Sequence, residues 1–198
     1  MELYLIRHGQ TDWNKEERLQ GSIDIQLNEN GRSMAVLASQ RLKDVHFDRI
    51  FSSPLSRAYV TAEIICGERT LPIEVDQRLK EISFGEKEGC LYTDWKAPDS
   101  PYRYFFSMDE ADKYFPPPGG ESIEHLNERT KEFVQTVIEP LAQTNQRIMI
   151  VAHGALLASV MCYLENRTKK HFWGDGLRKN CQETIFTYDC ASKKWIKL

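Results

Sequence analysis

Four side chains in this sequence have the chemistry needed to bind and transfer a phosphoryl group: Arg7, His8, Arg57 and His153. A guanidinium group presents paired N–H donors that match the oxygens of a phosphate. Nearby cations disfavour protonation of an imidazole, which leaves a neutral ring nitrogen able to attack phosphorus. A glycine follows each histidine, Gly9 and Gly154, and we expect it to let a ligand approach the backbone. Phosphoryl transfer depends mainly on positioning and charge stabilisation, so these groups suffice if the fold brings them together.

Three short apolar segments precede these residues and are typical of buried strands. Residues 3–6 lead directly into the first arginine and histidine, and residues 148–152 lead into the second histidine. Residues 49–51 precede a helix that we expect to open with an N-cap serine, Ser53, and to carry Arg57 in its first turn. Because the carboxyl ends of parallel strands form the ligand-binding edge of an open α/β sheet, we expect all four side chains to meet there.

Apolar residues at helical spacing separate the predicted strands. They follow Asn28 and the second histidine, and a longer amphipathic helix is expected from Ser122 to Pro140. Strands that alternate with helices predict an α/β fold of three layers, α/β/α, around a largely parallel central sheet. Residues 184–188 and 195–198 are separated by a polar turn, and this pattern predicts two final strands that form an antiparallel edge.

One segment interrupts the alternation of strands and helices. Eight of the 24 residues at 92–115 are aromatic, and the segment closes with three prolines and two glycines at 116–120. We expect an aromatic-rich insertion at about 92–118 that lies over the edge of the sheet. The chain of 198 residues is then a single domain, since one domain is typical of this length.

Composition narrows the class of protein. Apolar residues make up 41% and charged residues 28%, with a formal net charge of −3, which argues against a protein whose main partner is nucleic acid or an anionic membrane. No apolar segment approaches the ~20 residues of a membrane span. The five cysteines are scattered, without a Cys-x-x-Cys pair, so we expect reduced thiols and a cytoplasmic protein. We expect no metal and no cofactor. The oligomeric state stays open.

The candidate residues lie within ordered sequence blocks that resemble a known family. The blocks are LIRHGQTDWN at 5–14, LNENG at 27–31, SPLSRA at 53–58, LKE at 79–81 with FG at 84–85 and EG at 88–89, PGGES at 118–122, and VAHG at 151–154. In this order, they are similar to the histidine phosphatase superfamily, in its phosphoglycerate-mutase-like branch. The resemblance covers most of residues 3–154 and implies a phosphoglycerate-mutase-like fold.

The resemblance implies a role for each matching residue. His8 is implied to be the nucleophile that becomes phosphohistidine. Glu81 is implied to be the acid that protonates the leaving oxygen and the base that then activates water; from the residues alone, Glu86 and Glu88 are competing candidates. The residues implied to bind and stabilise the phosphoryl group are Arg7, Asn14, Arg57 and His153. Further contacts with the substrate are expected from Gln20, Gly21, Ser22 and Trp95.

Three functions fit these residues. The first is a metal-independent phosphomonoesterase acting on a small phosphorylated metabolite, the second a cofactor-dependent phosphoglycerate mutase, and the third a non-catalytic relative that binds phosphorylated ligands. A mutase of this family carries an adjacent arginine pair after the acid motif and an asparagine after the second His-Gly, where this chain has Ala155. The aromatic insertion predicts a preference for leaving groups that are neutral and apolar or ring-bearing, as in an aryl phosphate or a nucleoside monophosphate. Because this chain lacks the arginine pair and the asparagine of a mutase, we expect a phosphatase.

Overall fold

The computed structural model describes residues 1–198 and is built on a six-stranded sheet with strand order β3-β2-β4-β1-β5-β6. The parallel strands are β1 (Glu2–Arg7), β2 (Arg49–Ser52), β3 (Ile73–Val75) and β4 (Arg147–Ala152). The strands that complete the sheet are β5 (Glu183–Asp189), antiparallel to β1, and β6 (Lys194–Lys197), antiparallel to β5. The predicted parallel sheet with an antiparallel edge is confirmed.

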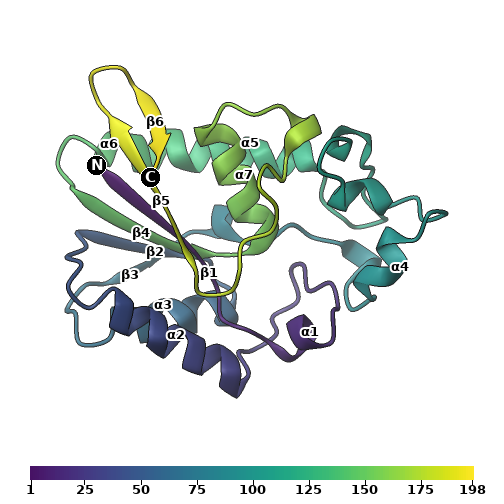
Figure 1. The fold of residues 1–198 in the computed structure, drawn as a ribbon, viewed down its shortest axis with the longest axis horizontal. Helices are drawn as coiled ribbons and strands as arrows, with labels where there is room; N and C mark the ends of the chain where they lie inside the picture. The colour runs from purple at the N-terminus through teal and green to yellow at the C-terminus, as the bar shows by residue number, and fades with distance from the viewer.

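Helices cover both faces of this sheet, which confirms the three-layer prediction (Figure 1). One face packs against α2 (Glu29–Arg41) and α3 (Ser56–Cys66), and the other against α5 (Ile123–Phe133) and α7 (Gly154–Leu164). A π-helical segment (Val134–Ile138) and α6 (Glu139–Leu141) extend α5. Because both faces are covered, β1 and β4 are apolar at every position between their ends rather than at alternate positions.

The helix starts expected after Asn28 and at Ser122 are confirmed, and both residues act as N-caps. The side chain of Asn28 accepts a hydrogen bond from the Gly31 N–H, 2.8 Å away, at the start of α2. The Ser122 hydroxyl accepts one from the His125 N–H, 3.1 Å away, at the start of α5. Each bond satisfies a backbone donor that the first turn of a helix leaves without a partner.

The start of α3 differs from the prediction. The helix begins at Ser56, with Leu55 as its N-cap residue and no side-chain cap, so Ser53 is not the cap. The Ser53 hydroxyl accepts a hydrogen bond from the Leu55 N–H at 3.2 Å and lies 2.7 Å from Nε2 of His153. Arg57 still lies in the first turn. The sequence correctly indicates a polar side chain at this turn, but the partner of the Ser53 hydroxyl is His153, a residue distant in the sequence.

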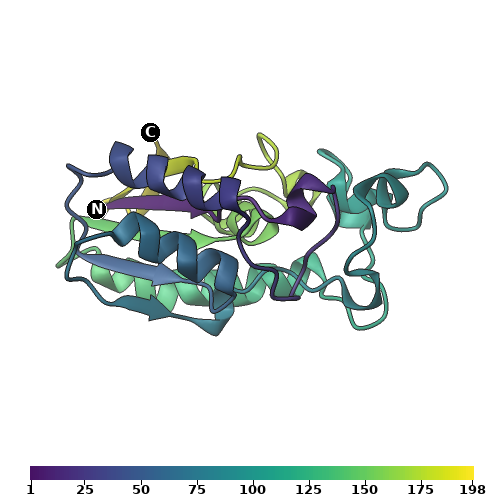
Figure 2. The same ribbon diagram turned by 90° about the horizontal axis from the view of Figure 1, so that it is seen from below.

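The structure contains short elements that the sequence pattern did not predict. Strand β3 has three partly exposed residues and lies at the edge of the sheet, too short to show a period of two. The other short elements are α1 (Asp12–Lys15), α4 (Tyr92–Lys96) and 3₁₀ turns at Gln77–Leu79, Gly85–Lys87, Arg103–Phe106, Ala111–Lys113 and Lys169–His171. Figure 2 shows that residues 92–118 extend beyond the carboxyl ends of the strands. No helix has both the length and the apolar composition to cross a bilayer.

Candidate active site

The four cationic and imidazole side chains meet at the carboxyl ends of β1, β2 and β4. The register pairs Arg7 with Ala152, so His8 and His153 follow on neighbouring strands, and their ring centroids are 5.1 Å apart. Arg57 joins them from the first turn of α3, directly after β2. All four are buried, and Arg57 and His153 have no exposed surface. The structure thus brings together the four residues that the strand-end argument grouped.

Three of these residues, Arg7, His8 and Arg57, line a pocket at the sheet edge, whereas His153 lies beside His8 and is not itself a lining residue. The pocket's polar and glycine lining residues are Arg7, His8, Asn14, Gln20, Gly21, Arg57, Glu81 and Gly154. Its apolar and aromatic lining residues are Leu19, Phe84, Tyr92, Phe105, Phe106, Ala155, Trp173 and Leu177. Arg7 and Arg57 give the pocket a cationic wall, as an anion requires, and the apolar part of the lining is largely aromatic.

His8 is held as a neutral imidazole with one nitrogen free to react. Its Nδ1 lies 2.7 Å from the carbonyl oxygen of Gly9, which can only accept, so Nδ1 carries the proton and Nε2 keeps its lone pair. Burial, followed by the charges of Arg57 and Arg7, lowers the pKa of His8 well below its usual range. The ring is therefore neutral near pH 7. An unprotonated Nε2 is the form that can attack phosphorus.

His153 is also neutral and has one nitrogen without a protein partner. Burial, and then Arg57 and His8, lower the pKa of His153 well below its usual range. Its Nε2 lies 2.7 Å from the Ser53 hydroxyl, and its Nδ1 is buried with no hydrogen-bond partner. When Ser53 donates to Nε2, Nδ1 carries the proton and can donate to a phosphoryl oxygen.

The two arginines are anchored by backbone carbonyls and remain charged. Arg57 donates to the carbonyls of Gly21 and Ile23, both at 2.7 Å, and Arg7 donates to the carbonyl of Arg178 at 2.8 Å. The Nε atoms of both arginines are buried without a partner. Burial lowers the pKa of Arg57 to about 10 and also lowers the pKa of Arg7. Each guanidinium is thus fixed in place with unused donors, as phosphate binding requires.

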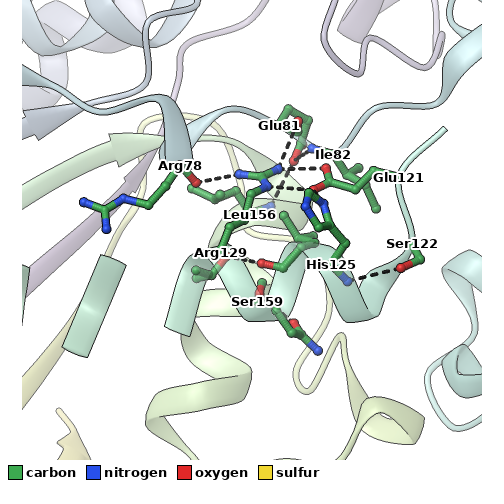
Figure 3. A network of polar contacts seen from close by, with 12 residues as sticks. Arg78, Glu81, Ile82, Glu121, Ser122, His125, Arg129, Leu156 and Ser159 are labelled. Carbon is green, nitrogen blue, oxygen red and sulfur yellow. Dashed lines mark hydrogen bonds and ion pairs between the residues drawn. The ribbon is translucent and has the colours of Figure 1, made fainter. Parts of the chain in front are cut away.

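Glu81 is the carboxylate that enters the pocket, and three backbone N–H groups hold it (Figure 3). Its oxygens accept hydrogen bonds from Leu156 at 2.9 Å, Ile82 at 3.0 Å and Ala155 at 3.1 Å. Two of these donors belong to the first turn of α7, so the carboxyl group is fixed against the start of that helix. The structure therefore places the residue implied to be the acid beside the residues implied to bind phosphate.

The two competing glutamates lie outside the pocket. Glu88 accepts hydrogen bonds from the backbone N–H groups of Ser22 at 2.8 Å, Phe84 at 3.0 Å and Ile23 at 3.1 Å. It thus joins the 20–24 loop to the turn at 83–85. Glu86 is exposed beside Lys87. Neither carboxylate lines the pocket.

The other expected contacts divide between pocket and scaffold. Asn14 lines the pocket next to Tyr92, and its Oδ1 accepts a hydrogen bond from the Thr11 N–H at 3.2 Å. Gln20 and Gly21 also line it, and Oε1 of Gln20 is buried without a partner. Ser22 does not line the pocket, because its N–H and hydroxyl are both bound to Glu88.

Trp95 does not line the pocket either, which corrects the expectation that it contacts the substrate. It is 2% exposed, stacked on Tyr102 with ring centroids 4.9 Å apart and packed edge-on to Phe84 at 5.0 Å. These ring contacts hold the indole in the core of the insertion, so the side chain faces other aromatic rings instead of the pocket.

We expect Trp95→Ala to act mainly on stability. Truncating a buried indole removes its packing and leaves a cavity, which typically lowers the free energy of unfolding by about 3–5 kcal/mol. Urea unfolding measures this loss. Phe115→Ala is the matched control, since Phe115 lies in the same insertion but is 79% exposed, and its truncation should change stability by no more than about 0.5 kcal/mol. Equal losses in the two variants would contradict this assignment.

Apart from Phe84, the aromatic lining comes from two segments whose contribution could not be read from the sequence. The insertion contributes Tyr92, Phe105 and Phe106, and the C-terminal segment between α7 and β5 contributes Trp173 and Leu177. The density of aromatic residues pointed to the first segment without distinguishing pocket from core. No sequence signal pointed to the second segment.

The two glycines that follow the histidines differ in role. A Cβ at Gly9 would meet the carbonyl oxygen of Gly31 at 2.4 Å, so this glycine allows the segment after β1 to pack against the start of α2 and does not face a ligand. A Cβ at Gly154 would meet Cδ1 of Leu177 at 2.5 Å at the edge of the pocket. The expectation of backbone approach by a ligand is therefore wrong for Gly9 and stays a prediction for Gly154, which lines the pocket.

Comparison with known proteins matches residues 3–198 to the histidine phosphatase superfamily (branch 1). Phosphoserine phosphatase 1 of Hydrogenobacter thermophilus is 33% identical over 178 residues, covering 89% of this chain and 82% of that protein. A 2,3-bisphosphoglycerate-dependent phosphoglycerate mutase of Cytophaga hutchinsonii is 32% identical over 165 residues, 82% of this chain and 76% of the mutase. The solved structure of a mycobacterial glucosyl-3-phosphoglycerate phosphatase in complex with VO3 has a TM-score of 0.86 and 30% identity, covering 100% of this chain and 96% of that chain.

The family match covers the pocket residues as well as the sheet and its helices. It begins at residue 3, before the first arginine and histidine, and includes every segment that lines the pocket. The shared architecture confirms the phosphoglycerate-mutase-like fold. The chain therefore belongs to the histidine phosphatase superfamily (branch 1) and is a phosphatase.

Proposed function

We propose that this chain is a metal-independent phosphomonoesterase that hydrolyses a small phosphorylated metabolite through a phosphohistidine on His8. The observation that carries the proposal is the neutral His8 ring, with Nδ1 bound to the Gly9 carbonyl, in a pocket lined by two buried guanidinium groups. Arg7 and Arg57 supply the positive charge that a metal ion supplies in other phosphatases. The relatives named above include phosphatases of small phosphorylated molecules, which supports the substrate class.

The pocket residues account for both halves of the reaction. In the first half, Nε2 of His8 attacks phosphorus, the bond from phosphorus to the leaving oxygen breaks, and Glu81 gives its proton to that oxygen. In the second half, Glu81 takes a proton from water, the water oxygen attacks phosphorus, and the bond from phosphorus to Nε2 breaks. Arg7, Arg57 and His153 stabilise the charge on the other phosphoryl oxygens throughout.

The residues of the pocket favour hydrolysis over the mutase reaction. A phosphoglycerate mutase must also bind a carboxylate and a second phosphate, which requires further cations. Arg7 and Arg57 are the only cations that line this pocket, and the rest of its charge is the carboxylate of Glu81. The non-catalytic alternative would require a missing catalytic group, whereas His8 and Glu81 both line the pocket and His153 lies next to His8.

A panel of phosphomonoesters assayed in metal-free buffer tests the proposal. We expect hydrolysis that persists in excess EDTA and that vanadate inhibits, because vanadate resembles the phosphoryl group in transfer and would occupy the same cationic wall. Arg7 and Arg57 do not depend on added metal, so chelation should change the rate by less than about twofold. A strict requirement for Mg²⁺ or Zn²⁺ would contradict the proposal.

The aromatic lining predicts which leaving groups are preferred. Phe106 is half-buried, lines the pocket and stacks with Trp173, which also lines it, so the two rings form one aromatic surface for the leaving group. We expect AMP to be a better substrate than 3-phosphoglycerate, because the apolar wall offers no partner for a carboxylate. Phe106→Ala should lower kcat/KM for AMP about tenfold, the upper end of what one aromatic contact contributes, and should leave 3-phosphoglycerate nearly unchanged.

Phe115→Ala provides the matched control for this comparison. It removes the same side chain from the same insertion, but at an exposed position outside the pocket. The ratio of kcat/KM for AMP to that for 3-phosphoglycerate should stay at the parent value. If 3-phosphoglycerate is the better substrate, or if the two phenylalanine variants change the ratio equally, the aromatic lining has only a packing role.

A further inference from the structure

We propose that Arg129 is a positioning residue for Glu81, holding the segment that carries this carboxylate in register with the start of α7. The inference rests on the proposed function, in which Glu81 protonates the leaving oxygen. Arg129 lies in α5 and does not line the pocket. Any effect of Arg129 on the reaction must therefore pass through the residues that it holds.

The guanidinium of Arg129 is bound to two carbonyls of the segment that ends in Glu81 (Figure 3). It donates to the carbonyl oxygen of Arg78 at 2.5 Å and to that of Glu81 at 3.3 Å. These carbonyls lie three residues apart, so the planar guanidinium spans the segment and restricts it at both ends. A side chain with a single donor could not hold both carbonyls at once.

Glu121 fixes the plane of this guanidinium from the other side. Its two oxygens accept hydrogen bonds from Nε of Arg129 at 2.7 Å and from Nη2 at 2.9 Å, which is a bidentate ion pair. Burial alone would raise the pKa of Glu121, but the hydrogen bonds from Arg129 and His125 outweigh it and hold the pKa below its usual range. Glu121 therefore remains ionised and keeps Arg129 oriented.

One peptide group connects Arg129 to the catalytic carboxylate. The carbonyl of the Glu81–Ile82 peptide accepts from Arg129, and the N–H of the same peptide donates to Oε1 of Glu81 at 3.0 Å. The direction of this peptide therefore depends on the guanidinium, and one of the three hydrogen bonds to the carboxylate depends on the peptide. Loss of Arg129 should leave Glu81 present but poorly aimed at the leaving oxygen.

Misplacement of a proton donor has a signature that loss of stability lacks. A leaving oxygen that forms a basic alkoxide or phenoxide needs a proton in the transition state, whereas a nitrophenolate departs without one. A displaced Glu81 should therefore slow hydrolysis of phenyl phosphate and spare 2,4-dinitrophenyl phosphate. A general loss of folded enzyme would lower both rates by the same factor.

The test is kcat/KM for these two esters in Arg129→Gln, beside the parent and Glu81→Gln. We expect Glu81→Gln to lower kcat/KM for phenyl phosphate by ~10²–10³-fold, within the range of general acid catalysis, and for the dinitrophenyl ester far less. Arg129→Gln should show the same selectivity at smaller size, ~10-fold against less than ~3-fold. Glu121→Gln should show the same selectivity as Arg129→Gln, with the larger loss for phenyl phosphate, and it decides the outcome if Arg129→Gln does not fold.

Arg69→Gln is the matched control. Arg69 also donates to backbone carbonyls, those of Leu42 and Ile65 among them, but holds the end of α3 instead of the pocket. It should leave the ratio of the two esters unchanged. Equal losses for both esters in the Arg129 and Glu121 variants, with Glu81→Gln still selective, would overturn the inference and leave the proposed function intact. A parent enzyme that hydrolyses neither ester would overturn both.

Discussion

Replacing His8 with alanine is expected to abolish turnover, with a loss of at least ~10⁴-fold in kcat/KM. No other side chain in the pocket is positioned as a nitrogen nucleophile, because His153 has its Nε2 against Ser53. The fold should survive the change. The backbone of His8 keeps its hydrogen bonds to Ala152 at 2.9 Å and Asn180 at 2.7 Å, and the imidazole itself binds only the adjacent Gly9 carbonyl.

The measurement combines steady-state kinetics with trapping of the intermediate. Parent enzyme quenched during turnover of a ³²P-labelled ester should carry a label that is stable in base and labile in acid, and peptide mapping should place it on His8. His46→Ala is the control, since His46 is exposed and does not line the pocket, and it should retain parent activity. Full activity of the His8 variant, or label on a serine or an aspartate, would exclude the proposed mechanism.

Removing the guanidinium of Arg57 is expected to cost ~10²–10³-fold in rate, comparable to the loss of a preorganised oxyanion donor. Arg57 combines complete burial, a fixed position on two carbonyls and a free Nε. Arg57→Lys keeps the charge but cannot donate to Gly21, Ile23 and a phosphoryl oxygen at the same time, so it should recover only part of the loss. Arg7→Ala should cause a loss of similar size.

Inhibition by vanadate separates this effect from a defect in folding. If Arg57 stabilises the phosphoryl group in transfer, its loss should weaken vanadate inhibition in parallel with the rate. Arg69→Ala again serves as the control, because it removes an arginine that binds backbone carbonyls away from the pocket. Parent-like vanadate inhibition in Arg57→Ala would show that Arg57 only supports the 20–24 loop.

Much of the fold follows from local patterns in the sequence. The apolar segments before Arg7 and His153 are continuous because β1 and β4 are buried on both faces, and such segments are visible without knowledge of the tertiary structure. Asn28 and Ser122 cap their helices as predicted, since an N-cap depends only on residues three positions apart. Ser53 was assigned wrongly by the same reasoning, because a distant histidine binds its hydroxyl.

The candidate site also has a part that local sequence patterns predict and a part that depends on tertiary contacts. The grouping of Arg7, His8, Arg57 and His153 follows from the sequence pattern, because each residue lies close after a strand and the ends of parallel strands share one edge. The surroundings of these residues depend on tertiary contacts. Phe106 lines the pocket, whereas Trp95 is buried in the core. Glu81 enters the pocket and Glu88 does not, and Arg129 of α5 holds the segment of Glu81. The difference has a physical cause. A strand end places its neighbours through backbone geometry, whereas the direction of a loop side chain depends on contacts with residues far away in the sequence.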